Sequence, residues 1–455
     1  MSKRPLFHFT AEKNWINDPN GLSYFNGEYH MFYQHNPENC YWGNMTWGHA
    51  KSNNLFDWEY LPHALHPDSK EFGDIDGCFS GSGLVENGEL YLFYTGVKML
   101  TKQANQFGNT ITIGPDDLVP TQILAKTKDG EKFEKLEKIE LSIPEECSKA
   151  HVRDPKVWKK GGFWYLAIGA KDNEGGKILI YSSKDMRRWE LFSKISEKNM
   201  GYMWECPDLF EIGGKDLLMF SPEGVSEDGQ KSISGYYLGD FNYENGGFEH
   251  EEFQRVDYGF EYYAPQSFED EKGRRIIIGW LVGHAPLDGE GWNGMMTLPR
   301  EVKLRDGKVS TLPVEELKDF RKEKIAEFSE ISKAKNCYEI ELRLKKLDDF
   351  SMTLFKDGRN GLKLSYFKER ESFVLDREGV INGFEPLTTF GTLRECKISE
   401  NKEMNLRVIV DRCVAEIYIN DGEKVMSAVV NPRDNQIEIE VLGEILSKEI
   451  YILEK

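Results

Sequence analysis

Three short acidic motifs hold the residues best suited to chemistry. They are Trp15-Ile-Asn-Asp-Pro-Asn-Gly21 around Asp18, His151-Val-Arg-Asp-Pro155 around Asp154, and Trp204-Glu-Cys-Pro-Asp208 around Glu205. Hydrolysis of a glycosidic bond needs two carboxyl groups, one to protonate the leaving oxygen and one to attack or to activate water. Three acids brought to one channel would suit this reaction, whereas buried carboxylates are costly in a structural core.

Each motif constrains its acid locally. Proline pushes the residue before it toward an extended conformation, so Asp18 and Asp154, which both precede proline, have little conformational freedom. Glu205 follows an indole and precedes a thiol, and poor solvation of this kind suits a general acid. Taken singly, each acid also fits a structural role: an Asx turn at Asp18, a strand-end turn at Asp154, and a half-buried, hydrogen-bonded glutamate at position 205.

Short strands joined by tight turns must position these acids. Aromatic and β-branched runs alternate with Gly, Asn and Asp turns along the first two thirds of the chain. The dipeptides Asn26-Gly27, Asn87-Gly88 and Gly161-Gly162 predict hairpins with primed turns, because such residues tolerate a positive φ.

A weak internal repeat indicates how the strands are grouped. The segment Ser52-Asn-Asn-Leu-Phe-Asp-Trp58 recurs as 128–133 and 183–189, with a poorer copy over 239–248. The repeated aromatic positions are about 63 residues apart on average, the size expected of a four-stranded propeller blade. The repeat predicts a five-bladed β-propeller over residues 1–312, and a set of unrelated hairpins is the alternative.

The sequence changes character near Pro313. Apolar residues at 314, 317, 320 and 325 recur at roughly a helical period, so residues 313–329 are expected to form a linker helix. Beyond them, strands such as 338–344 and 436–442 alternate apolar and polar residues, as two packed antiparallel sheets require. We therefore expect an all-β chain that ends in a β-sandwich over residues 330–455, with a structural role.

Composition disfavours several partners. The 455 residues carry a formal net charge of −19, which opposes binding to nucleic acid or to an anionic membrane. No segment resembles a signal peptide or reaches the ~18 apolar residues of a membrane span. The number of cysteines, seven, is odd, and the sequence contains no Cys-x-x-Cys motif. Both features indicate reduced thiols. The expectation is a cytoplasmic protein without a metal or cofactor, of open oligomeric state.

The motifs, in their order and spacing, resemble family 32 of the glycoside hydrolases, which holds invertases, sucrose-6-phosphate hydrolases and fructanases. Flanking matches are Phe32-Tyr-Gln-His-Asn-Pro37, Trp47-Gly-His49, Phe79-Ser-Gly-Ser82, Tyr263-Ala-Pro-Gln-Ser267 and Leu298-Pro-Arg300. The resemblance covers nearly the whole chain. It implies a five-bladed β-propeller followed by a β-sandwich, and retaining hydrolysis of terminal β-D-fructofuranosides such as sucrose or sucrose 6-phosphate.

The resemblance also implies a role for each acid. Asp18 would attack the anomeric carbon of the fructosyl unit, and Glu205 would protonate the departing oxygen and later activate water. Asp154 would hold fructose hydroxyls and stabilise the transition state without forming a bond. Other positions that look like sugar contacts of the family are Trp15, Asn17, Gln34, Trp42, Phe79, Ser80, Arg153 and Trp280.

The sequence does not determine which group is attached to fructose in the substrate. Hydrolysis of short fructo-oligosaccharides and fructosyl transfer are alternatives, and a non-catalytic sugar-binding propeller is disfavoured because all three acids are present. His49, Lys51 and Lys171 are candidates for binding a phosphate. Residues 98–122 exceed the usual family connection and are expected to form an exposed loop near the channel mouth, which would favour short substrates.

Overall fold

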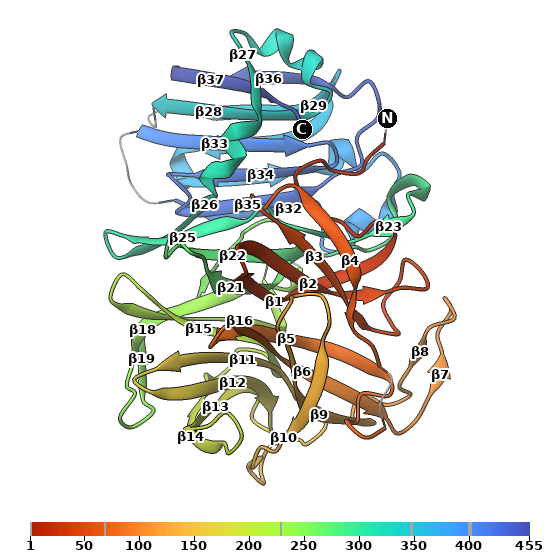
Figure 1. Cartoon of the computed structure of the whole chain (residues 1–455). Coiled ribbons are helices and arrows are strands. Elements are labelled where there is room, and N and C mark those ends of the chain that lie inside the picture. Colours follow the sequence, from red (N-terminus) through yellow and green to blue (C-terminus); the bar gives the residue numbers. More distant parts are fainter. Residues whose placement is uncertain (1, 68–69, 228–229, 346–348, 399–402) are drawn as a thin grey trace.

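The computed structural model describes residues 2–455 except 68–69, 228–229, 346–348 and 399–402. It shows two β-rich parts, with the C-terminal strands stacked on one side of the N-terminal ones (Figure 1). Within the described residues, no helix is long and apolar enough to cross a membrane. The helices are short 3-10 segments: η1 (Leu287–Gly289), η2 (Glu315–Phe320), η3 (Phe328–Ala334), η4 (Lys368–Arg370), η5 (Glu378–Val380) and η6 (Glu385–Thr388).

Five mainly antiparallel sheets form the first part, each built around four main strands. The first sheet contains β1 (Asn14–Phe25), β2 (Glu28–Asn36), β3 (Thr46–Ser52) and β4 (Trp58–Leu65). The second contains β5 (Gly77–Glu86), β6 (Glu89–Met99), β9 (Leu118–Thr127) and β10 (Glu134–Ile139). The third contains β11 (Val152–Lys160), β12 (Phe163–Lys171), β13 (Gly176–Ser183) and β14 (Glu190–Ile195). The last two contain β15 (Met203–Ile212), β16 (Lys215–Glu227), β18 (Gly235–Phe241) and β19 (Phe248–His250); and β21 (Tyr262–Glu269), β22 (Arg275–Leu281), β25 (Arg300–Arg305) and β26 (Lys308–Pro313). Short strands extend them: β17 (Gln230–Ser232), β20 (Gln254–Arg255), β23 (Trp292–Asn293) and β24 (Met295–Met296).

The innermost strands of the five sheets close into a ring. In chain order, β1, β5, β11, β15 and β21 each contact the next, and β21 returns to β1. The late strand β23 pairs in parallel with β1, so the end of this part completes the sheet at its start. The sheets are therefore the blades of a five-bladed propeller, and the predicted fold class is confirmed.

The weak sequence repeat marks the turn before the outermost strand in four blades. Asn54, Asp129, Asp185 and Asn242 each accept backbone N–H bonds from the residues two and three positions ahead. These are Asx turns, in which a short polar side chain replaces a backbone acceptor. The primed hairpin turns predicted at 26–27, 87–88 and 161–162 are confirmed, since both residues of each have a positive φ.

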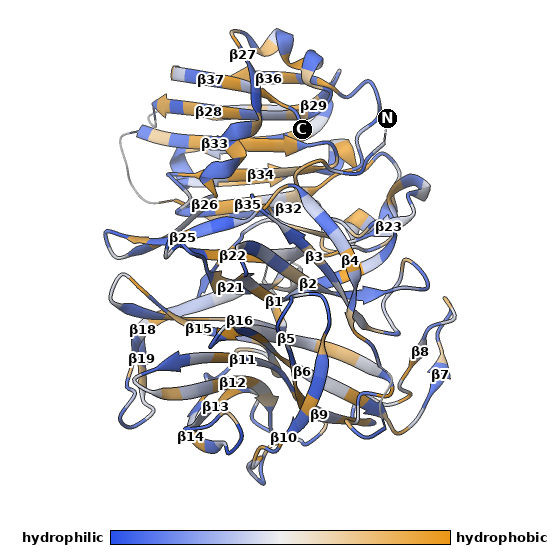
Figure 2. Cartoon of the chain, viewed as in Figure 1, coloured by the Kyte–Doolittle hydropathy of each residue, from blue (hydrophilic) through white to orange (hydrophobic). Residues whose placement is uncertain are grey.

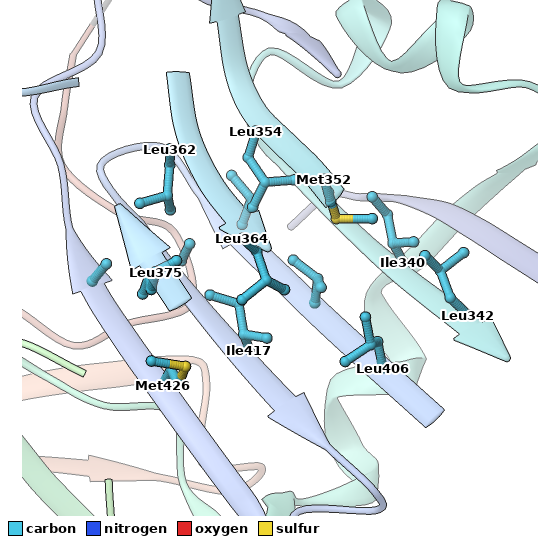
Figure 3. Close-up of a cluster of buried hydrophobic side chains, with 14 of the residues drawn as sticks. Ile340, Leu342, Met352, Leu354, Leu362, Leu364, Leu375, Leu406, Ile417 and Met426 are labelled. Atoms are coloured by element: carbon cyan, nitrogen blue, oxygen red, sulfur yellow. The ribbon is translucent and has the colours of Figure 1, made fainter. Parts of the chain in front are cut away.

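Two packed sheets form the second part. One contains β27 (Arg321–Ile325), β28 (Cys337–Lys345), β33 (Glu403–Asp411), β34 (Val414–Ile419), β35 (Lys424–Val429) and β37 (Ile445–Leu453), and the other β29 (Phe350–Asp357), β30 (Asn360–Phe367), β31 (Ser372–Asp376), β32 (Leu393–Lys397) and β36 (Glu438–Leu442). Hydrophobic and hydrophilic positions intermix along these strands (Figure 2). The buried face includes Ile340, Leu364, Leu375 and Ile417, which meet between the sheets (Figure 3). This arrangement is the β-sandwich.

The segment between the two parts differs from the expected linker helix over 313–329. It forms the 3-10 helix η2, then the strand β27, which pairs with β37 at the edge of the sandwich. The apolar positions 314, 317 and 320 are three residues apart, and this is the repeat of a 3-10 turn, not of an α-helix. Val314 and Leu317 are fully buried, so these positions fix the segment against the core.

Buried charges join the N-terminal segment and the last blade to the sandwich. The ring of His8 lies 3.0 Å from Asp411 Oδ2 and 3.3 Å from Glu416 Oε1, and all three side chains are fully buried. Arg300 of β25 binds Asp257 at 3.0 Å and Glu416 at 3.1 Å. Burial opposes a charge on His8, but the two carboxylates outweigh it and raise its pKa to about 9.

This network predicts a pH-dependent stability. The folded-state pKa of His8 lies above its ordinary value of 6.5, so its contribution is complete below pH 6.5 and is lost as the pH rises through 9. We expect the difference in free energy of unfolding between the wild type and His8→Asn to fall by about 3 kcal/mol across that range. Urea unfolding at several pH values measures it, and a difference that stays constant from pH 6 to pH 10 would contradict the assignment.

Candidate active site

Every innermost strand of the propeller has a break in register at the same level. The breaks lie at Ile16/Pro19, Phe79/Gly81, Arg153/Lys156, Glu205/Asp208 and Tyr263/Gln266. Four of them contain an X-Pro dipeptide, because proline cannot donate a ladder hydrogen bond and is tolerated at a bulge. A bulge re-aims side chains, so the five breaks place one set of bulge residues at the channel: Asp18, Ser80, Asp154, Cys206 and Ala264.

Asp18 and Asp154 are joined through this ring of bulge residues. The Ser80 hydroxyl donates to Asp18 Oδ2 at 2.5 Å. The Cys206 thiol lies 3.6 Å from Asp18 Oδ2 and 3.8 Å from Asp154 Oδ2, and the Cys206 N–H donates to Asp154 Oδ2 at 3.0 Å. Cys206 therefore lies between the two carboxylates and fixes their separation.

The backbone at Asp154 adopts a left-handed conformation, with φ of 69°, and not the extended one expected before Pro155. Aspartate tolerates this region better than most residues. Its N–H donates to the Thr95 hydroxyl of the preceding blade at 3.0 Å, and that hydroxyl donates to Gln122 Oε1 at 2.7 Å. The same device recurs between the last two blades, where the Ala264 N–H donates to the Ser221 hydroxyl at 3.1 Å. Hydroxyl groups of neighbouring blades therefore hold the bulges.

Glu205 lies one residue before the bulge of its strand. Its Oε1 accepts hydrogen bonds from Arg153 Nε at 3.0 Å and Nη2 at 2.8 Å, and its Oε2 accepts one from the Tyr263 hydroxyl at 2.6 Å. Arg153 and Tyr263 occupy the same position before their own bulges. The Glu205 side chain remains 22% exposed, so it can still reach a bound molecule.

Nearby carboxylates affect the pKa values of Asp18 and Asp154. Burial is the main cause that raises the pKa of Asp154 to about 7, and the charges of Glu205 and Asp18 add to it against the opposing effect of Arg153. Burial and then the charge of Glu205 also raise the pKa of Asp18, while hydrogen bonds from Ser80 and Asn17 lower it. The predicted trio of Asp18, Asp154 and Glu205 is thus brought together in one channel.

Trp15, Asn17, Gln34 and Trp280 surround Asp18. The Trp15 indole donates to Asn17 Oδ1 at 2.8 Å, and Asn17 Nδ2 donates to Asp18 Oδ1 at 3.0 Å. Trp280 meets Trp15 edge-on at 5.6 Å between ring centroids. Gln34 lies across from the bulge and donates to the Cys78 carbonyl at 2.9 Å. These contacts fix the orientation of the Asp18 carboxylate.

An aromatic cavity of about 560 Å³ opens next to these residues. Trp42 and Phe79 meet edge-to-face across it at 6.1 Å. Trp42 is 41% exposed, so it is free to contact a ligand and is not a core residue. The other lining residues are Trp15, Tyr41, Met99, Asn105, Phe107, Ile111, Thr112, Leu118, Gly283 and His284.

Half of this lining comes from the loop expected over residues 98–122. The loop contains the two-stranded hairpin β7 (Gln103–Ala104) and β8 (Thr110–Ile111). Phe107 stacks on Tyr41 with 3.5 Å between ring centroids, and the fully buried Asn109 donates to the Tyr41 and Trp42 carbonyls. The loop is therefore anchored as a wall of the cavity, although many of its side chains are exposed as expected.

The three residues predicted as candidates for binding a phosphate lie in different surroundings. His49 is fully buried and stacks on Phe32 in the propeller core, and Lys51 forms ion pairs with Glu28 and Glu59 on the outer strands. Neither reaches the channel residues. Lys171 alone of the three lies near them, 3.8 Å from Asp116 of the 98–122 loop.

Sequence reasoning missed part of the surroundings of Glu205. Trp204 packs on Phe220 in the blade interior and donates to the Met200 carbonyl, so it does not line the channel. The contacts of Glu205 come instead from Arg153 and Tyr263, which lie on other strands. The Tyr263-Ala-Pro sequence carried a signal, because it repeats the X-Pro pattern of the acidic motifs. Among the described residues, no group of three or more His, Cys, Asp or Glu is placed to hold a metal ion.

Comparisons with known proteins agree along the whole chain. The Glycosyl hydrolases family 32 N-terminal domain matches residues 8–313, and the Glycosyl hydrolases family 32 C terminal matches residues 303–449. The sucrose-6-phosphate hydrolase of Escherichia coli is 36% identical, with 96% of this chain and 91% of that protein covered. The raffinose invertase of Escherichia coli is 35% identical, with 94% and 90% covered.

Solved structures show the same architecture. The GH32 beta-fructofuranosidase of Bombyx mori superposes with a TM-score of 0.83 at 32% identity, covering 100% of this chain and 94% of its own. A mutant of that enzyme was solved in complex with sucrose. The sucrose-6-phosphate hydrolase of Lactobacillus gasseri gives a TM-score of 0.86 at 27% identity, with 99% and 93% covered.

Proposed function

This chain belongs to family 32 of the glycosyl hydrolases, and we propose that it hydrolyses terminal β-D-fructofuranosides such as sucrose or sucrose 6-phosphate with retention of configuration. The observation that carries the proposal is the convergence of Asp18, Asp154 and Glu205 on one propeller channel, where Cys206 contacts both aspartates and Arg153 and Tyr263 hold Glu205. Two of these acids suffice for a double displacement, and the third is free to bind sugar hydroxyls.

Asp18 is the nucleophile in this proposal. Ser80 and Asn17 each donate a hydrogen bond to one of its oxygens, which leaves the carboxylate little rotational freedom. A fixed carboxylate can attack the anomeric carbon along one line, and the glycosidic C–O bond breaks as the new ester bond forms. The product of this step is a covalent fructosyl-enzyme intermediate.

Glu205 is the acid and then the base. It protonates the leaving oxygen in the first step, and the resulting carboxylate takes a proton from water in the second. Arg153 donates to one oxygen of Glu205 and Tyr263 to the other, so the group stays in one place through both steps. Asp154 binds fructose hydroxyls and stabilises the positive charge that develops on the sugar ring.

The relatives support more than one leaving group. One is described as a raffinose invertase, and a cavity of about 560 Å³ is within the range of small-ligand sites, so short oligosaccharides are a second substrate class. Fructosyl transfer remains an alternative fate of the intermediate. A cytoplasmic location is also part of the proposal, because the number of cysteines is odd and six of the seven are buried.

Trapping by methanol tests the stereochemistry. We expect sucrose hydrolysis in dilute methanol to yield methyl β-D-fructofuranoside beside fructose, because methanol attacks the fructosyl-enzyme from the face that the first leaving group vacated. Nuclear magnetic resonance of the methyl glycoside distinguishes the anomers. The α anomer would contradict retention, and no release of fructose from any fructofuranoside would overturn the proposed function itself.

A further inference from the structure

Charged side chains continue outward from Glu205 and lead toward the place of the leaving group. Arg153 Nη2, which binds Glu205, lies 3.4 Å from Glu223 Oε2. Arg153 Nη1 lies 3.3 Å from Nδ1 of His151. A group that receives its proton from Glu205 must lie close to these residues, so their charges act on it directly.

The 98–122 loop adds a carboxylate to this rim. Asp116 Oδ1 lies 2.7 Å from Nε2 of His151 and 3.8 Å from Nζ of Lys171. Its side chain is 68% exposed, so the carboxylate lies on the open side of both basic groups. Burial, and then the cations of Arg153 and Lys171, lower the pKa of His151 against the effect of Asp116, so a positive charge on the ring is disfavoured.

Each of the two cations described on this rim, Arg153 and Lys171, therefore lies beside a carboxylate. Arg153 faces Glu205, and Lys171 faces Asp116. Glu223 adds a further carboxylate. A phosphate group carries about −1.5 to −2 charges at pH 7, so it would meet repulsion here instead of a basic pocket.

The aromatic cavity next to the channel, as far as the structure describes it, also lacks positive charge. None of its described lining residues is lysine or arginine. Its one histidine, His284, is neutral at pH 7, because burial lowers its pKa to about 4. Trp42 and Phe107 offer aromatic faces, which pack against the apolar faces of sugar rings.

We propose that the half of the site that receives the leaving group is built for uncharged sugars, and that Asp116 determines this specificity. The chain then hydrolyses sucrose and short neutral oligosaccharides in preference to sucrose 6-phosphate. This inference rests on the proposed function and selects between its two substrates. Asp116 acts by balancing Lys171 and by repelling a phosphate.

Kinetics with the two disaccharides test the proposal on the full-length protein. We expect kcat/KM for sucrose to exceed that for sucrose 6-phosphate by about tenfold or more, the effect of roughly 1.4 kcal/mol of like-charge repulsion. Asp116→Asn should move the ratio toward sucrose 6-phosphate by about tenfold, through KM for the phosphorylated sugar. Asp240→Asn is the matched control, because Asp240 is also an exposed carboxylate paired with a lysine, Lys215, and should leave the ratio unchanged.

Lys171→Gln provides the opposite test. In the proposal Lys171 offsets the charge of Asp116, so its loss should leave kcat/KM for sucrose nearly unchanged and lower that for sucrose 6-phosphate further. A wild type that prefers sucrose 6-phosphate, together with a selective loss of that preference in Lys171→Gln, would overturn the inference while leaving the hydrolase function intact. An unchanged ratio in Asp116→Asn would also overturn it. Failure to hydrolyse either sugar would instead overturn the proposed function.

Discussion

Replacing Asp18 by Asn should lower kcat for sucrose by roughly 10⁴-fold or more, because the amide cannot form the ester on which the double displacement depends. The substitution keeps the size of the side chain, and Ser80 and Asn17 retain a partner at the same site. The folded protein should therefore have a thermal midpoint at least as high as that of the wild type, since removal of one buried charge relieves its repulsion with Glu205. Initial rates of fructose release and a thermal melt measure the two effects.

A second buried carboxylate provides the control for Asp18. Asp208 is fully buried in β15 and pairs with Lys156 at 2.9 Å, and none of its hydrogen bonds goes to Asp18, Asp154 or Glu205. Asp208→Asn should show the reverse pattern, with a lower thermal midpoint and a kcat of the folded protein close to that of the wild type, because it removes one partner of a buried ion pair. Near-normal turnover in Asp18→Asn, checked by mass spectrometry against reversion to aspartate, would exclude Asp18 as the nucleophile.

The propeller could be predicted because its blades repeat a local device. An Asx turn of this kind needs one Asn or Asp and the three residues after it, so the repeat is visible within a few positions of the sequence. The X-Pro pairs are equally local, and Asp18 and Asp154 were identified for that reason. Their shared level in the channel depends on the register of five separate strands, which is set by pairing between distant segments.

The surroundings of Glu205 could not be predicted from its neighbours in the sequence. Successive side chains of a strand point to opposite faces, so Trp204 packs inside the blade while Glu205 faces the channel. Its hydrogen-bonding partners, Arg153 and Tyr263, lie 52 and 58 residues away on adjacent blades. The contact between Asp116 and Lys171 also depends on how a long loop folds back over another blade. Linear spacing carries no signal for such contacts.

Glu205→Ala is the second change with a large expected effect. It should lower kcat/KM for sucrose by about 10²–10⁴-fold, because an alkoxide leaving group needs a proton from a positioned acid. With p-nitrophenyl β-D-fructofuranoside the rate of the first step should fall much less, since nitrophenolate departs without protonation. Attack by Asp18 then continues, and the covalent intermediate accumulates because no base activates water. A burst of nitrophenolate followed by a slow steady state measures this behaviour.

Adding azide to Glu205→Ala distinguishes loss of the acid/base group from loss of the local structure. A small anion fits the space left by the Glu205 side chain and needs no base, so it should attack the fructosyl-Asp18 ester, release the carboxylate and form β-D-fructofuranosyl azide. Tyr263→Phe is the matched control: it removes the hydrogen bond to Glu205 Oε2 but keeps the carboxyl group. We expect it to slow both substrates moderately without a response to azide, because Tyr263 positions the acid and does not replace it. Absence of the azide product in Glu205→Ala, or its formation in Tyr263→Phe, would assign the acid/base role to another residue.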